Sequence, residues 1–130
     1  MPLVRIDLLQ GKSADHRRAI GDGVHRALVE AFKAPADDRF QVITQHAPGS
    51  LVYDPDYLGI HRTDDVVFIQ IVAGKWRDTA TKKELYRQIA ANLSRSPGLR
   101  PEDIVITLTP NDRDDWSFGR GEAPYVKEEA

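Results

Sequence analysis

The fold is decided by a stretch near the start of the chain, LVRIDLL, at residues 3–9. Its apolar side chains at positions 4, 6 and 8 share one face, whereas Arg5 and Asp7 lie on the other. This alternation predicts a strand with one buried face. A second stretch, VVFIQIV at residues 66–72, is apolar almost throughout, which is typical of a strand covered on both faces.

A helix is predicted after each of these strands. Ser13 can cap the first helix, and the second can start from a capping box at Thr81 or from Asp78 as the cap. Gly21 and Gly23 should weaken the first helix by up to about 1 kcal/mol each relative to alanine. Apolar residues recur at helical spacing in both segments: Ile20, Val24, Ala27, Leu28, Ala31 and Phe32 in the first, and Leu85, Ile89 and Leu93 in the second.

The chain repeats one strand–helix–strand unit, because further strands are predicted at residues 40–44 and 104–108. The two units cover about residues 1–60 and 64–130 and form a single domain. Right-handed crossovers then give an α/β fold (α+β in some classifications) with a four-stranded, mainly parallel sheet and both helices on one face. The other face stays open, and another subunit is the economical way to cover it.

Composition narrows the classes of function. Of the 130 residues, 41% are hydrophobic and 29% charged, as in soluble globular proteins, and no signal peptide is evident, so a cytoplasmic protein is expected. The net charge of −2 comes from mixed charges, which disfavours nucleic-acid binding, and no apolar run is long enough to span a membrane. There are no cysteines, and the four histidines have no metal-ligand spacing. No metal or organic cofactor is expected.

Pro2 is the first candidate for chemistry. We expect Met1 to be removed, because the initiator methionine is usually cleaved before a residue as small as proline. The secondary amine that remains is held by the first strand, and it can act as a base when neutral or as an acid and electrostatic catalyst when protonated. Proline at position 2 also occurs without any role, so its place directly before a strand is what favours a catalytic interpretation.

Three charged residues could act with Pro2. Asp38 lies between the first helix and the second strand, where its carboxylate would favour a cationic prolyl nitrogen, although a solvated turn explains it equally well. Lys75 and Arg77 follow the third strand and suit a substrate carboxylate, with Arg77 offering a bidentate fork. Surface residues before a helix would also have this composition.

Aromatic residues near the end of the chain could enclose a pocket. Trp116 and Phe118 lie in the segment WSFGRG at residues 116–121, and Tyr125 follows. They could keep a small site dry, or they could serve packing alone. Among the histidines, His46 is the one expected near a site, because it follows the second strand.

These residues together resemble the tautomerase superfamily, and within it the malonate semialdehyde decarboxylase family. The likeness covers essentially the whole chain: Pro2 before the repeated unit, the segment PADDR at residues 35–39, the segment QHAPG at residues 45–49, VVF at residues 66–68 and, most specifically, WSFGRG at residues 116–121. The resemblance implies a trimer in which Pro2 is a cation that polarises the substrate carbonyl. It also implies that Asp38 helps to keep Pro2 protonated.

The resemblance further implies that Trp116 and Phe118 are walls of the pocket, and Tyr125 stands where the family has another aromatic residue. One segment departs from the family pattern, which has two arginines separated by one residue after the third strand. Here the segment reads GKWR at residues 74–77, with one residue inserted and Lys75 in place of an arginine.

The function expected from this resemblance is decarboxylation of malonate semialdehyde to acetaldehyde and carbon dioxide, with hydration of an unsaturated acid as a possible side activity. A keto–enol tautomerase acting on a substrate such as phenylpyruvate is the alternative, and it needs a neutral Pro2 as base. A second alternative is a trimeric protein that uses the fold only for binding, because a fold does not dictate its function.

Overall fold

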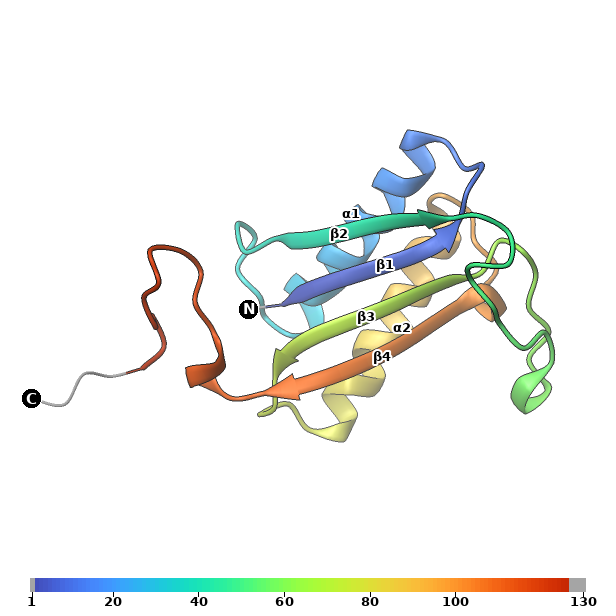
Figure 1. The fold of residues 1–130 in the computed structure, drawn as a ribbon. Coiled ribbons are helices and arrows are strands. Elements are labelled where there is room, and N and C mark those ends of the chain that lie inside the picture. The colour runs from blue at the N-terminus through green and yellow to red at the C-terminus, as the bar shows by residue number, and fades with distance from the viewer. Residues whose placement is uncertain (1, 127–130) are drawn as a thin grey trace, which may run out of the picture.

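The computed structural model describes residues 2–126, so Met1, whose removal is expected, lies outside the described residues. Each half of the chain forms one strand–helix–strand unit (Figure 1). The elements are β1 (Leu3–Leu9), α1 (Ala14–Ala31), β2 (Phe40–His46), β3 (Val67–Gly74), α2 (Thr79–Arg95) and β4 (Ile104–Asn111). Short 3-10 turns lie at Tyr57–Gly59, Pro101–Asp103 and Arg113–Asp115.

The four strands form one sheet in the order β2-β1-β3-β4. The β1–β2 and β3–β4 pairs are parallel, with Leu3 opposite Phe40 and Val67 opposite Ile104. The central β1–β3 pair is antiparallel. The expected mainly parallel sheet is therefore confirmed, with a single antiparallel pairing where the two units meet.

This topology gives the sheet two distinct ends. At one end, which we call the Pro2 end, β1 and β2 begin and β3 and β4 finish. At the opposite end, which we call the linker end, β1 and β2 finish, and the segment 47–66 leads into β3. Residues from both halves of the sequence therefore meet at each end of the sheet.

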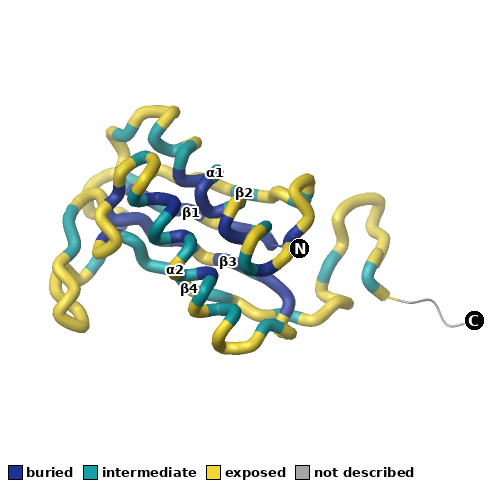
Figure 2. Tube along the Cα trace, turned by 180° about the vertical axis from the view of Figure 1, so that it is seen from behind, coloured by how far each residue is buried: buried dark blue, intermediate teal, exposed yellow. Residues whose placement is uncertain are grey.

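Both helices cover the same face of the sheet, as expected, and the core lies between them (Figures 1 and 2). Alternate residues of β1 and β3 point into this layer and are almost fully buried. These residues are Val4, Ile6 and Leu8 from β1 and Val67, Ile69 and Ile71 from β3, which pack against Ile20, Val24 and Leu28 of α1 and Leu85, Ile89 and Leu93 of α2.

Local contacts account for the starts of the helices and for one glycine. The Ser13 hydroxyl accepts a hydrogen bond from the His16 amide at 3.0 Å, and the Asp78 carboxylate accepts one from the Thr81 amide at 2.8 Å. Asp78, not Thr81, is therefore the cap of α2. A Cβ at Gly23 would lie 2.7 Å from a Leu93 methyl carbon, so the glycine that weakens α1 lets α2 approach it closely.

The other face of the sheet carries partly exposed apolar side chains. Phe40 is 46% exposed and Val42 is 40% exposed on the edge strand β2. The segment 47–66 adds the exposed residues Val52, Tyr57 and Leu58. Among the described residues, we find no helix with the length and apolar character needed to cross a bilayer.

Candidate active site

Pro2 is buried directly before β1, at the Pro2 end of the sheet. Leu3 lies opposite Val72 in the antiparallel β1–β3 pair, so one further step along both strands places Pro2 opposite Ala73. Because side chains alternate along a strand, Pro2 shares the helix-covered face with Val4. The loop that follows β3 therefore begins beside Pro2.

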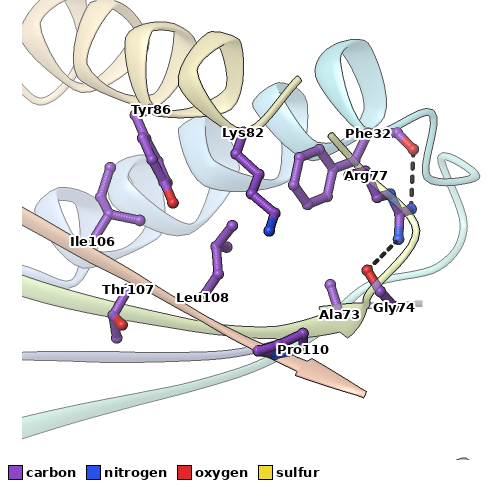
Figure 3. Close-up of a pocket in the computed structure, with 10 residues that line it drawn as sticks. All are labelled: Phe32, Ala73, Gly74, Arg77, Lys82, Tyr86, Ile106, Thr107, Leu108 and Pro110. Atoms are coloured by element: carbon purple, nitrogen blue, oxygen red, sulfur yellow. Dashed lines mark hydrogen bonds between the residues drawn. The ribbon is translucent and has the colours of Figure 1, made fainter. Parts of the chain in front are cut away.

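The β3–α2 loop carries Arg77 toward the helices (Figure 3). The Arg77 guanidinium donates hydrogen bonds to the carbonyl oxygens of Phe32 at 3.1 Å and Gly74 at 3.3 Å. Its carbon atom lies 4.7 Å from the centre of the Phe32 ring and 4.9 Å from that of Trp76. Burial lowers the pKa of Arg77, but arginine stays charged at any physiological pH. The site thus contains one fixed, partly buried cation.

Trp76 separates Arg77 from Lys75. A Cβ at Gly74 would collide with the Trp76 ring, so the glycine lets this ring fold back over the backbone. On the far side, the Arg113 guanidinium lies 4.7 Å from the ring centre. Trp76 therefore acts as a spacer between the two basic side chains that follow β3.

Arg77 lines a cavity of about 380 Å³ between α2 and strands β3 and β4 (Figure 3). Two of its lining side chains, Arg77 and Lys82, are cations, and none is a carboxylate. The sequence analysis missed Lys82 and Tyr86, whose spacing of four residues already places them on one face of α2. The remaining lining residues are Phe32, Ala73, Gly74, Ile106, Thr107, Leu108 and Pro110.

Lys75 points elsewhere. Its ammonium lies 2.7 Å from the Asp112 carboxylate, its side chain is 64% exposed, and it lines a separate hollow of about 670 Å³ with Trp76 and Arg113. The hydrogen bond that the Lys75 ammonium donates to the Asp112 carboxylate raises the pKa of Lys75. Within one chain, Lys75 and Arg77 therefore do not share a pocket.

The predicted aromatic residues gather around Phe118. Its ring stacks on Trp116 with a centroid distance of 5.2 Å, meets Tyr125 edge-on at 5.6 Å, and lies 5.5 Å from Phe40 of β2. The Trp116 indole donates a hydrogen bond to the Asn111 side-chain oxygen at 3.0 Å, which ties the tail to the end of β4. The tail thereby reaches the Pro2 end of the sheet.

Asp38 lies beside this aromatic group. A hollow of about 260 Å³ is lined by Asp38, Phe40, Phe118 and Tyr125, together with Pro35 and Asp37. Burial raises the pKa of Tyr125, and the negative charge of Asp38 raises it further. The structure thus brings Asp38 and the aromatic residues together just before β2, the strand that pairs with the start of β1.

His46 lies at the linker end, on the last residue of β2, and not beside Pro2. Its Nε2 atom is 2.6 Å from a carboxylate oxygen of Asp7 on the open face of the sheet. Within one chain, His46 is therefore separated from Pro2 by the length of a strand.

One acidic group among the described residues has the spacing to hold a cation. Carboxylate oxygens of the exposed residues Asp112, Asp114 and Asp115 lie within 4.8 Å of one another. Asp112 already pairs with Lys75, and Asp115 accepts a hydrogen bond from the Asp112 amide at 2.8 Å. These contacts explain the group without a metal ion.

Comparison with known families agrees with this arrangement. A family model described as tautomerase enzyme matches residues 38–119, and a second model with the same description matches residues 2–60. The chain belongs to the tautomerase family. The probable tautomerase YusQ of Bacillus subtilis (strain 168) is 39% identical to this chain over 98% of its length and 100% of YusQ.

Solved structures of malonate semialdehyde decarboxylases are also similar to this chain. One, described with its decarboxylase and hydratase activities, is 35% identical with a TM-score of 0.90 over 95% of each chain. Another, inhibited by 3-bromopropiolate, is 41% identical with a TM-score of 0.90 over 95% of this chain and 93% of that one. A fused 4-OT symmetric trimer, 16% identical with a TM-score of 0.76 over 92% of this chain and 94% of that one, shares the fold.

Proposed function

We propose that this member of the tautomerase family is a cofactor-independent decarboxylase of a small β-oxo acid, with malonate semialdehyde as the substrate and a cationic Pro2 as the catalytic group. The proposal is best supported by the position of three residues at the Pro2 end of the sheet. These residues are the buried Pro2, Asp38 before β2, and the fixed cation Arg77 after β3. The likeness to malonate semialdehyde decarboxylases over nearly the whole chain supports the same activity.

In the proposed reaction, the bond between the carboxylate carbon and the methylene carbon breaks. Its electron pair moves into the carbonyl system as carbon dioxide leaves, which forms the enolate of acetaldehyde. A protonated Pro2 beside the aldehyde oxygen would stabilise that developing negative charge. A proton from Pro2 or from water then reaches the terminal carbon and gives acetaldehyde.

The other residues at this end would orient the substrate. Arg77 would bind the carboxylate so that the breaking bond lies parallel to the carbonyl π orbitals. Asp38 would favour the cationic form of Pro2. Trp116, Phe118 and Tyr125 would exclude water, which favours the loss of neutral carbon dioxide. Lys75 and His46 stay predictions, because the geometry of one chain gives them no contact with this group.

The active form is proposed to be a homotrimer. The open sheet face carries Phe40 and Val42, and the adjoining segment exposes Val52, Tyr57 and Leu58, a combination expected of a subunit interface. The symmetric trimer among the proteins of the same fold supports this assembly. Hydration of an unsaturated oxo acid, which also needs a cationic Pro2, is proposed as a side activity, and the cytoplasm as the compartment.

Keto–enol tautomerisation is the second candidate, and the two cations of the neighbouring cavity favour it. Arg77 and Lys82 would both lower the pKa of the prolyl amine and so favour the neutral base that tautomerisation needs. Asp38 has the opposite effect. A non-catalytic trimeric binding protein is the remaining alternative.

A side-by-side assay separates these candidates. The purified chain, confirmed by mass to begin at Pro2, is supplied with malonate semialdehyde and, separately, with phenylpyruvate. We expect release of carbon dioxide from the first substrate, and a loss of at least about 100-fold in kcat in Pro2→Ala. Faster turnover of phenylpyruvate would favour the tautomerase, and unchanged rates in Pro2→Ala would leave only the binding protein.

A further inference from the structure

We propose that Lys82, rather than Lys75, is the second cation that holds the substrate carboxylate beside Arg77. The inference rests on the proposed function, because it assigns a residue to the same site. It also assigns the ligand class of the cavity in Figure 3, a small organic anion, whatever reaction follows binding.

Lys82 is placed for this role by the first turn of α2. It lies four residues after the cap Asp78, on the helix face that also carries Tyr86. Figure 3 shows the Lys82 ammonium pointing into the cavity, between Leu108 and Phe32. No ion pair joins Lys82 to any other residue between positions 2 and 126, so its charge is available to a ligand.

The charges around the cavity select an anion. Arg77 and Lys82 are its charged lining residues, and the start of α2, whose helix dipole is positive, adds to the same potential. Arg77 is fixed by its hydrogen bonds to Phe32 and Gly74. Lys82 has a flexible stem and can move to meet the ligand. A rigid guanidinium and a mobile ammonium can therefore close on one carboxylate from two sides.

Lys75 lacks these properties. It already pairs with Asp112, and the Trp76 ring stands between it and Arg77. Moving Lys75 to the cavity would require breaking that ion pair and displacing the ring. Lys75 is therefore less well placed than Lys82 to bind a substrate carboxylate together with Arg77.

The test compares four variants as purified full-length proteins. Lys82→Gln removes the charge, Lys82→Arg keeps it, and Lys75→Gln removes the competing lysine. Lys83→Gln is the matched control, because Lys83 is an exposed lysine of the same turn that does not line the cavity. We expect the KM for malonate semialdehyde to rise about tenfold or more in Lys82→Gln, with a smaller change in kcat. Lys83→Gln should match the wild type, and Lys82→Arg should recover most of the affinity.

The inference is overturned if the KM of Lys82→Gln stays within twofold of the wild-type value, or if Lys75→Gln raises the KM more than Lys82→Gln does. Thermal unfolding of each variant shows whether the helix is intact. Recovery in Lys82→Arg but not in Lys82→Gln shows that the positive charge is needed, which a purely structural role of the side chain would not require.

A binding measurement separates this inference from the proposed reaction. The unreactive carboxylate 3-hydroxypropanoate is titrated into ¹⁵N-labelled protein and followed by NMR. Weaker binding in Lys82→Gln but not in Lys83→Gln supports the inference even if no decarboxylation is found. Equal binding by these two variants, or no binding by the wild type, overturns it.

Discussion

The two ends of the sheet are built from equivalent parts and differ in what those parts contact. Asp103 precedes β4 at the linker end, as Asp38 precedes β2 at the Pro2 end. Arg17 and Lys82 each stand four residues after a helix cap, Ser13 in α1 and Asp78 in α2. A repeated unit thus supplies each end with a carboxylate from one half of the chain and a cation from the other.

At the linker end, the carboxylate and the cation form hydrogen bonds with other residues of the chain. Asp103 is fully buried and accepts hydrogen bonds from the amide of Thr63 at 2.6 Å and its hydroxyl at 2.8 Å. Arg17 donates to the Lys12 carbonyl at 2.7 Å and to Gln45 at 3.2 Å. Lys12 pairs with Asp65. The segment 47–66 therefore uses the linker end for stability.

At the Pro2 end, the equivalent groups border cavities. Lys82 faces the cavity beside Arg77, and Asp38 borders the aromatic hollow. The loops after β1 and β3 have the same length, residues 10–13 and 75–78, but the second one carries Trp76 and Arg77 next to the cavity. The comparison shows how one unit, used twice, gives a structural end and an end suited to binding a ligand.

The largest effect is expected for Arg77, which directly precedes the cap of α2 and lines the cavity, whereas Lys12 precedes the cap of α1 and pairs with Asp65. Arg77→Gln should lower kcat/KM by about 10- to 100-fold, because a charge-assisted hydrogen bond to the substrate carboxylate is lost. It should also lower the free energy of unfolding by about 1–2 kcal/mol, through the lost bonds to Phe32 and Gly74. Steady-state kinetics and urea unfolding measure the two effects, and unchanged kcat/KM would contradict the proposed role.

The two equivalent carboxylates should separate stability from activity. Asp103→Asn should lower the free energy of unfolding by about 1–3 kcal/mol, because an NH2 donor replaces one of the two carboxylate oxygens that accept separately from the amide and the hydroxyl of Thr63. Asp38→Asn should instead act mainly on activity and reduce decarboxylation, because the negative charge that favours a cationic Pro2 is lost. The opposite pattern, with Asp38→Asn the less stable variant, would mean that both ends are structural.

A smaller contrast is expected for the equivalent cations. Arg17→Gln should lower the free energy of unfolding by about 1 kcal/mol, since it removes bonds to the Lys12 carbonyl and to Gln45. Lys82→Gln should be within about 0.5 kcal/mol of the wild type. Equal losses in chemical denaturation would indicate that Lys82 has a structural partner and is not reserved for a ligand.

Much of the fold could be predicted because its determinants are local. The alternation in residues 3–9 and the stripe through Ile20, Val24 and Leu28 define elements by periodicity, and the repeat then defines their arrangement. The cap of α2 remained open between Asp78 and Thr81, because both have suitable side chains and the choice depends on backbone geometry. The close packing at Gly23 also needed the position of Leu93 on the other helix.

The candidate site could be predicted where position along the chain brings residues to the same end of the sheet. It was harder to predict where the direction of a side chain decides which cavity the residue lines. Asp38, Phe118 and Tyr125, which were singled out separately in the sequence, line one hollow, and their roles stay predictions. Lys75 and Arg77 are close in sequence, but Trp76 directs them into different hollows. Lys82 was overlooked because a lysine in a first helical turn is ordinary in sequence, and its cavity exists only once α2 packs on β4.

The central claim is that Pro2 is a cation in the resting protein, and ¹⁵N NMR of labelled proline tests it most directly. After the mass shows that Met1 is absent, the prolyl nitrogen is titrated in the wild type and in Asp38→Asn. The account predicts a pKa well above neutrality in the wild type and a lower one in the variant, because a nearby negative charge is lost. A wild-type pKa at or below neutrality would contradict the cationic mechanism and favour tautomerisation by a neutral base.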